Sequence, residues 1–460
     1  MPQLNPQIFR AYDIRGVAGT DLIPQTSELL GRGYGTLIRR ISGPRVAVGR
    51  DNRPSSEELQ RAFMRGAAAA GCQVIDIGLS LSPMLYFAVC YLGLDGGVNV
   101  TGSHNPVQYN GFKLTARDAV PVAEDEIQEI RRIIEAGAFD ARAAQARVET
   151  RSIAEDYLRE VSSRVKLHRS LKVVLDTGNG TAGLFAPQLL RRLGCQVIEL
   201  FCESDGTFPH HLPDPEVEEY LEDLKSEVVR QGADFGIAID GDGDRLGVID
   251  EKGQRHEADE VLILLARDFL RRHPGERVIM DVKCSQVLVD DIKAHGGQPV
   301  MWKTGHSLLK KKMREDGILL GGEVSGHMFF KEDWYGFDDA LLASAKLMEF
   351  VSREPLPISA HWRGLPQVAS TPELKAPVPD EEKFEVVEKV AAHFKSRYPD
   401  SLDIDGLRIR FPDGWGLVRA SNTNPYLTLR FEAPTQERLE EIKREVYSVL
   451  SGYPSVKLPG

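Results

Sequence analysis

The sequence has few cysteines and no long hydrophobic run. Its five cysteines are odd in number and never occur as Cys-x-x-Cys, so neither a disulfide framework nor a zinc site is indicated. No stretch of about 18 apolar residues occurs, and the first ten residues lack the apolar core of a signal peptide. We therefore expect a cytoplasmic protein with reduced thiols and no membrane partner.

Positive charge is also in short supply. The 57 Lys and Arg residues are outnumbered by 68 Asp and Glu residues, which gives a formal net charge of -11. A protein that binds a nucleic-acid backbone needs a basic face from which counterions are released, so nucleic acid is not an expected partner. The basic run at residues 310–314 follows an apolar pair and is typical of the solvated face of a helix.

A length of 460 residues is too great for one ordinary core and predicts three or four domains. One pattern occurs three times, in units that begin at Arg45, Leu171 and Arg277. Each unit has a short apolar run, an amphipathic stretch, a glycine and a second β-branched run, which is typical of a βαβ crossover. The pattern therefore predicts three α/β domains of one topology.

The chain changes character after about residue 365. A polar, proline-bearing stretch precedes a helical pattern at 381–396, three strand-like segments and a last helical pattern at 436–450. This order predicts a small α+β domain with an antiparallel sheet. The expected domains are therefore residues 1–150, 151–254, 255–365 and 366–460.

The strongest local motif is Asp240-Gly-Asp242-Gly-Asp244-Arg245, which lies between two strand-like segments. Three carboxylates on alternate positions, separated by glycines, direct hard oxygen ligands at one divalent cation, and magnesium is the natural choice. An EF-hand is excluded because Arg245 occupies the position where that loop needs glycine, and because the flanks are strands rather than helices.

A second motif, Thr101-Gly-Ser103-His104-Asn105-Pro106, follows the strand-like residues 97–100. Taken alone it is equally compatible with an exposed nucleophile and with a simple turn. Because a phosphorylated Ser103 would supply a phosphate oxygen to the predicted metal, the two motifs together favour a phosphoryl carrier, with Lys113 folded back over it. No GxxxxGK[ST] loop is present, so the phosphoryl donor is expected to be a phosphosugar rather than ATP.

Two further loops carry residues that suit a phosphosugar. Arg419-Ala-Ser421-Asn422-Thr423-Asn424-Pro425 combines an arginine fork, hydroxyls and turn N–H groups, which together would hold a phosphate without transferring it. Gly321-Gly-Glu323-Val-Ser325-Gly-His327 can present Glu323 and Ser325 to vicinal hydroxyls. The first segment is also compatible with a plain loop, and the second with a structural histidine.

The four motifs, in this order, resemble the α-D-phosphohexomutase superfamily, and in particular its bacterial phosphomannomutase/phosphoglucomutase branch. The resemblance covers the whole chain. It implies three α/β domains and a fourth, TATA-box-binding-like domain around a central cleft. It also implies reversible phosphoryl transfer between the 1- and 6-positions of a hexose, through a phosphoserine and a hexose 1,6-bisphosphate, with glucose 1,6-bisphosphate as activator.

The resemblance also implies roles for individual residues. Ser103 would be the phosphoserine and would bind magnesium together with Asp240, Asp242 and Asp244. Lys113 would be the acid/base partner. The opening Phe9-Arg-Ala-Tyr12-Asp-Ile-Arg15-Gly16 and the segment Lys303-Thr-Gly-His306 also match the family. The other implied site residues are Tyr12, Arg15, Arg245, Lys283, His306, Glu323, Ser325 and His327 for the sugar and cleft, and Arg419, Ser421, Asn422 and Thr423 for the distal phosphate.

The sequence leaves more than one substrate and reaction type open. The loop Gly-Glu-Val-Ser-Gly-His is close to the Gly-Glu-Met-Ser-Gly-His of phosphomannomutase/phosphoglucomutases, whereas phosphoglucosamine mutases usually have Gln in the middle and a Ser-Gly-Thr-Glu phosphate loop. Glucose and mannose phosphates are therefore favoured, and Val324 leaves the choice between them open. The motifs are also compatible with a magnesium phosphatase and with a non-catalytic phosphosugar-binding protein. No assembly segment is visible, so a monomer is expected.

Overall fold

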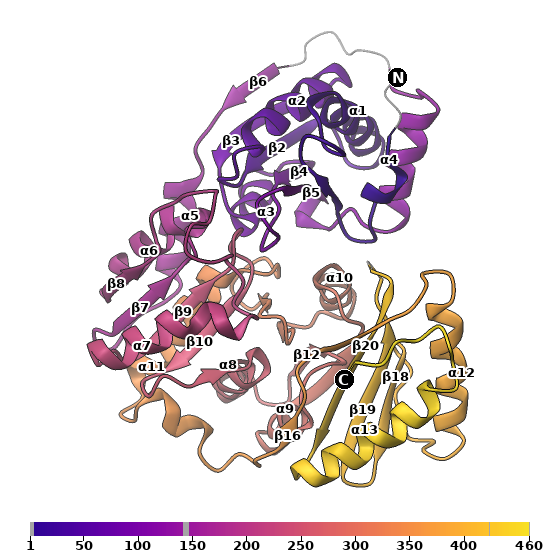
Figure 1. Cartoon of the computed structure of the whole chain (residues 1–460). Coiled ribbons are helices and arrows are strands. Elements are labelled where there is room, and N and C mark those ends of the chain that lie inside the picture. The colour runs from indigo at the N-terminus through magenta and orange to yellow at the C-terminus, as the bar shows by residue number, and fades with distance from the viewer. Residues whose placement is uncertain (1–3, 141–146, 423, 460) are drawn as a thin grey trace.

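The described part of the chain folds into four β-sheets with helices packed against them (Figure 1). The computed structural model describes residues 4–140, 147–422 and 424–459. In Figure 1 the N-terminal sheet lies at the top and the C-terminal sheet at the lower right, and the other two lie at the left and lower middle. This arrangement confirms the predicted α/β architecture with a distinct last domain.

The first three sheets share one topology. Each has three parallel strands and one antiparallel strand, in the orders β5-β4-β2-β3, β10-β9-β7-β8 and β15-β14-β12-β13. The first and last strands of each unit pair in parallel, as the two strands of a βαβ crossover do. The predicted threefold repeat is therefore confirmed. The strands are β2 (Arg45–Arg50), β3 (Gln73–Leu79), β4 (Gly96–Val100), β5 (Tyr109–Ala116), β7 (Lys172–Asp176), β8 (Gln196–Leu200), β9 (Phe235–Ile239), β10 (Leu246–Asp250), β12 (Arg277–Asp281), β13 (Gln298–Trp302), β14 (Leu320–Gly322) and β15 (Met328–Phe330).

Short strands extend the first two sheets, and helices cover all three. The first sheet gains β1 (Ile14–Val17) and β6 (Arg147–Thr150), and the second gains β11 (Arg255–His256). The helices are α1 (Pro24–Ile41), α2 (Ser56–Ala69), α3 (Ser82–Tyr91), α4 (Asp125–Glu135), α5 (Ala154–Ser163), α6 (Ala186–Arg192), α7 (Glu222–Gln231), α8 (Ala258–Arg272), α9 (Gln286–Ala294), α10 (His306–Asp316) and α11 (Ala340–Arg353). None of the helices in the described ranges combines the length and apolarity that crossing a membrane requires.

The basic run lies on α10, but the prediction that it faces solvent is wrong at Lys310. This side chain is buried, and its ammonium lies 2.8 Å from the carboxylate of Asp338 and 4.3 Å from the ring centre of Tyr86. The opposite charge compensates for the loss of hydration. The sequence pattern alone did not reveal the burial of Lys310, because its partner Asp338 lies 28 residues further along the chain.

The last sheet is antiparallel and differs from the other three. Its strands are β16 (Ala369–Ser370), β17 (Leu374–Pro377), β18 (Leu407–Phe411), β19 (Gly414–Ala420) and β20 (Tyr426–Ala433). Helices α12 (Lys383–Lys395) and α13 (Gln436–Leu450) contribute apolar side chains to one core with these strands. The predicted α+β character is thus confirmed, whereas the exact domain boundaries at 150, 254 and 365 stay a prediction.

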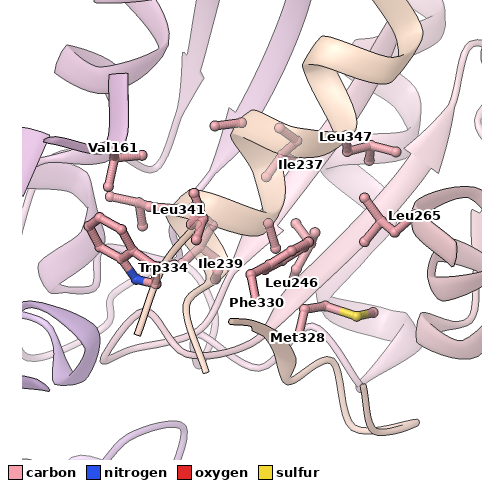
Figure 2. Close-up of a cluster of buried hydrophobic side chains, with 14 of the residues drawn as sticks. Val161, Ile237, Ile239, Leu246, Leu265, Met328, Phe330, Trp334, Leu341 and Leu347 are labelled. Carbon is pink, nitrogen blue, oxygen red and sulfur yellow. The ribbon is translucent and has the colours of Figure 1, made fainter. Parts of the chain in front are cut away.

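The predicted metal loop, residues 240–245, connects β9 to β10. Ile239 and Leu246, which flank it, are buried in a hydrophobic cluster with Phe330 and Leu341 (Figure 2). This cluster joins the second sheet to β15 and α11 of the third. The acidic loop is therefore anchored at both ends in a close-packed core, which limits how far its carboxylates can move.

Candidate active site

A cleft of about 650 Å³ is lined by loops from all four sheets. Every predicted catalytic or substrate-contacting residue in the described ranges lines it, and Thr423 lies outside those ranges. The predicted residues that line the cleft are Tyr12, Arg15, Ser103, Lys113, Arg245, Lys283, His306, Glu323, Ser325, His327, Arg419, Ser421 and Asn422. Residues as far apart as Tyr12 and Asn422, which are 410 positions apart in the sequence, thus meet in one cavity, as is common for small-molecule sites between domains.

Ser103 lies in the loop between β4 and β5, directly beside the acidic loop of the second domain. Its hydroxyl donates to the carboxylate of Asp240 at 2.8 Å, and the Nδ1 of His104 lies 3.0 Å away. Its backbone is left-handed, with φ of 50°, a conformation that L-residues rarely adopt. Such strain at a cleft-lining serine is typical of functional sites.

The acidic loop holds three fully buried carboxylates. Oxygens of Asp240, Asp242 and Asp244 all lie within 4.8 Å of one another. The Oδ1 atoms of Asp242 and Asp244 accept no hydrogen bond from the described residues. Burial, together with the charges of Asp244 and Asp242, raises the pKa of Asp240 well above its ordinary value. These hard oxygen ligands fit a divalent cation, which would relieve the repulsion among them.

Lys113, on β5, reaches the same carboxylates. Its ammonium lies 2.7 Å from Asp242 and also pairs with Asp244. Burial favours the neutral amine, but the two carboxylates outweigh it and hold the pKa of Lys113 well above its usual value. Lys113 is therefore a charged donor in this state of the site.

The loop between β14 and β15 contributes Glu323, Ser325 and His327. The Glu323 carboxylate accepts from the N–H of Gly305 at 2.6 Å, and Ser325 Oγ lies 2.8 Å from Nδ1 of His327. Nε2 of His327 is 3.4 Å from Asp244. Burial opposes the charged imidazolium, but Asp244 and Glu323 prevail and raise the pKa of His327 to about 10. His327 therefore ties the predicted sugar loop to the acidic loop.

His306 stacks against His327 across the cleft wall. The ring centres are 5.3 Å apart, and Nδ1 of His306 lies 3.1 Å from the carboxylate of Asp338. Burial, followed by the charge of Lys310, lowers the pKa of His306 despite that carboxylate. The pKa values of these two stacked histidines thus shift in opposite directions, because His327 has two acidic neighbours whereas His306 is buried near a lysine.

The predicted phosphate loop follows β19 and meets the first domain. Nδ2 of Asn422 donates to the hydroxyl of Tyr12 at 2.5 Å. Burial is the main reason that the pKa of Tyr12 rises to about 12, so the phenol stays neutral. Nε of Arg419 donates to Asp405 at 2.9 Å, and the same carboxylate accepts from the N–H of Thr304 at 3.0 Å. These contacts join the last domain to the first and the third.

Sequence reasoning missed the acidic partners of the cleft's cations. Glu216 pairs with Arg245, Glu373 lies 3.0 Å from Lys283, and Asp405 holds Arg419. These three acids lie in loops outside the four motifs, and nothing in the sequence distinguishes them from other acidic residues, so no local signal marks them. The sequence also offered no reason to assign His104 a role, although Nδ1 of its ring lies 3.0 Å from Ser103 Oγ. Arg15 lines the cleft while paired with Asp13 at 2.6 Å.

Comparison with protein families gives one consistent result. Four family models match the chain, described as alpha/beta/alpha domains I, II and III and the C-terminal domain of phosphoglucomutase/phosphomannomutase. They cover residues 6–141, 155–253, 257–368 and 373–449. The matches therefore extend over most of the chain, in the order in which the four sheets occur.

Individual relatives are similar to this chain in sequence over all or nearly all of their length. A phosphomannomutase/phosphoglucomutase of Pseudomonas aeruginosa is 46% identical over 442 residues, which are 96% of this chain and 95% of the relative. A phosphoglucomutase of Neisseria meningitidis is 42% identical over 463 residues and covers 100% of both chains. A crystal structure of a phosphoglucomutase/phosphomannomutase family protein from Burkholderia thailandensis superposes with a TM-score of 0.94 at 41% identity, covering 100% of both chains.

Proposed function

This chain belongs to the phosphoglucomutase/phosphomannomutase family, and on that premise we propose how its cleft moves a phosphoryl group between the 1- and 6-positions of a hexose. The enzyme is a reversible phosphohexose mutase, an isomerase. The observation that carries the proposed mechanism is the 2.8 Å hydrogen bond from Ser103 Oγ to the buried Asp240. This contact lies at the edge of a cleft that is lined by several lysine and arginine side chains. Ser103 is the proposed phosphoryl carrier.

Asp240, Asp242, Asp244 and Ser103 would hold the proposed magnesium ion. The donor set fits because it consists of buried oxygens, two of which accept no hydrogen bond from the described chain. When bound, the cation would withdraw charge from a phosphoryl group in transfer. The backbone N–H groups of residues 243–245 point at one Asp240 oxygen and fix the other toward Ser103.

The proton and the negative charge are handled by groups already in place. Protonated Lys113 lies among the acidic residues next to Ser103, so its ammonium can neutralise charge on the phosphoryl group and hydrogen-bond an oxygen that leaves. Lys113 would donate its proton more readily when the charges of Asp242 and Asp244, which raise its pKa, are shared with a bound cation. We propose it as the acid/base partner on this ground. In the loose transition state of phosphoryl transfer, such charge neutralisation is the main task of the protein.

The far side of the cleft would bind the phosphosugar. Arg419, Ser421, Asn422 and Thr423 are proposed for the phosphate that is not transferred, and Glu323, Ser325 and His327 for the sugar hydroxyls. Tyr12, Arg15, Arg245, Lys283 and His306 complete the proposed contacts. Because the two half-reactions present opposite ends of the sugar to Ser103, the bisphosphate intermediate must turn over inside the cleft. Contacts between the last domain and the first, such as Asn422 with Tyr12, would retain it during that turn.

Mannose and glucose phosphates are the proposed substrates. One relative is a phosphomannomutase/phosphoglucomutase and another a phosphoglucomutase, and the cleft loop Gly-Glu-Val-Ser-Gly-His is of that kind. Phosphoglucosamine is the second candidate. Its test is direct, because a glucosamine-specific enzyme would leave glucose and mannose phosphates unchanged.

Three finer points are also proposed. Glucose 1,6-bisphosphate would activate the enzyme by phosphorylating Ser103. The enzyme would work as a monomer, since its cleft is built from one chain. A cytoplasmic location is supported by five free cysteines, four of them buried, in the part of the chain that the structure describes.

The deciding experiment is a coupled assay of glucose 1-phosphate and mannose 1-phosphate conversion, with magnesium and trace glucose 1,6-bisphosphate. We expect both isomerisations in the wild type and their loss in Ser103→Ala, whereas Ser163→Ala, at an exposed position of α5, should behave as the wild type. Release of inorganic phosphate without isomerisation would instead identify a phosphatase. Binding of the sugar phosphate without either reaction would identify a non-catalytic protein.

A further inference from the structure

Arg53 belongs to none of the four motifs, yet it donates hydrogen bonds to the main chain of the loop between β4 and β5 that carries Ser103, here called the serine loop. Its side chain is fully buried. One terminal nitrogen donates to the carbonyls of Ser103 at 2.7 Å and Asn105 at 2.6 Å, and the other to those of Pro106 at 2.8 Å and Tyr109 at 3.2 Å. A planar guanidinium fork is the only side chain that can serve four carbonyls in this way.

Asp51 contacts both Arg53 and the N-terminal end of the serine loop. Its carboxylate accepts from Nε of Arg53 at 3.1 Å and from the N–H of Gly102 at 3.0 Å. The Asp51–Arg53 ion pair therefore contacts the main chain on both sides of the Ser103 hydroxyl. A left-handed backbone such as that of Ser103 persists only where its surroundings fix it, and these hydrogen bonds do so.

Residues of the second domain contact Arg53 and its neighbour Asn52. The ring of Phe208 covers the Arg53 guanidinium, with 4.9 Å between the guanidinium carbon and the ring centre. The side chain of Asn52 donates to the carbonyl of Asn179 at 2.8 Å and to Ser204 Oγ at 2.9 Å. Residues 51–53 thus connect the serine loop to the domain that carries the acidic loop.

We propose that Arg53 is a positioning residue for phosphoryl transfer, whose four carbonyl contacts hold Ser103 so that Oγ faces the acidic loop. This inference rests on the proposed role of Ser103 as carrier. Arg53 is not among the residues that line the cleft, so it acts through the loop and not on the sugar. Its effect should therefore fall on the rate of transfer and not on substrate affinity.

The test is Arg53→Lys, which keeps the charge but cannot reach four carbonyls in one plane. The measured quantity is the rate constant for phosphorylation of Ser103 by saturating glucose 1,6-bisphosphate, followed by intact mass. We expect it to fall about 100-fold, the loss typical of a reacting group displaced by about 1 Å, while KM changes little. Arg50→Lys is the matched control, because Arg50 ends β2 three residues before Arg53 but contacts the Asp51 carbonyl and Glu57 instead of the serine loop.

The rate constant and the final extent of Ser103 phosphorylation together distinguish a positioning role of Arg53 from a merely structural one. If Arg53 only stabilises the fold, Arg53→Lys would phosphorylate a smaller fraction of molecules at the wild-type rate constant, and the inference would be overturned. A lower rate constant that reaches the wild-type extent supports it.

Should Arg53→Lys fail to fold, Asp51→Asn takes its place, since it keeps the shape of the side chain. A rate constant reduced by about tenfold supports the inference, and an unchanged one overturns it. Wild-type protein that never becomes phosphorylated at Ser103 would instead refute the carrier role itself, and the proposal for Arg53 with it.

Discussion

The serine loop and the acidic loop approach each other closely at Gly241. A Cβ atom built at this position would lie 2.4 Å from the carbonyl oxygen of Ser103, a backbone atom that cannot rotate away. Gly241 lies outside the left-handed region, so alanine would carry no conformational penalty there. Gly241→Ala therefore tests mainly the spacing between the two loops, although its Cβ would also lie 3.1 Å from Cγ of Pro213.

The size of the effect follows from contact distances. A carbon–oxygen contact needs between 3.0 and 3.4 Å, so the two loops must separate by about 0.6 to 1 Å. The Ser103 carbonyl accepts a hydrogen bond from Arg53 at 2.7 Å and the acidic loop is anchored at both ends in the core, so neither loop can move away without losing contacts. A misplacement of about 1 Å between reacting groups costs on the order of 100-fold in rate. We expect kcat to fall by about that factor.

The assay is kcat and KM for glucose 1-phosphate at saturating magnesium, together with a thermal melt. KM should stay near the wild-type value, because the proposed phosphate and sugar contacts lie on other loops. Gly452→Ala is the control, since the nearest atom to its added Cβ would be 3.2 Å away in the last domain. A Gly241→Ala enzyme that keeps wild-type kcat would show that the spacing of the two loops does not limit transfer.

Three further predictions concern the metal, the last domain and pH. Chelation by EDTA should abolish isomerisation and added magnesium should restore it, as measured by the coupled assay. Asp405→Asn should raise KM about tenfold with little change in kcat, because Arg419 loses the partner that orients it. Burial raises the pKa of Asp339 to about 7, so the stability that this group contributes is complete below its unfolded pKa of about 4 and is lost as pH rises through 7. Asp339→Asn should therefore gain about 3 kcal/mol of stability relative to wild type between pH 5 and 8, measured by urea unfolding, and an unchanged difference would contradict that shift.

The fold could be predicted because its units repeat. Buried parallel strands read as continuous apolar runs, and a glycine that ends a helix marks where the next strand begins. The three units at Arg45, Leu171 and Arg277 thus became β2, β7 and β12, each with a parallel neighbour from its own unit. The prediction that the basic run on α10 faces solvent was wrong at Lys310, because burial of a lysine depends on a partner that no local pattern reveals.

The loops that meet in the cleft could likewise be predicted, since glycines and paired polar residues make them stand out, whereas the roles of their residues stay a prediction. Arg53 could not, although it contacts four carbonyls of the most conspicuous loop. It follows a strand in a segment with no unusual composition, and its value lies in hydrogen bonds to main-chain atoms about 50 residues away. Main-chain partners carry no side-chain signature in a sequence.

The acidic partners of Arg245, Lys283 and Arg419 suit an intermediate that must turn. Each of these cations already has a carboxylate within hydrogen-bonding reach. A phosphate that binds there replaces one anion by another, so the net gain is smaller than for an unpaired cation in a desolvated pocket. Tight, uniform binding of the bisphosphate would lower its energy without lowering the barrier to transfer, and would slow its release and reorientation. In the proposed mechanism the carboxylates would therefore keep these cationic side chains in place between turnovers and would limit how firmly either phosphate is held.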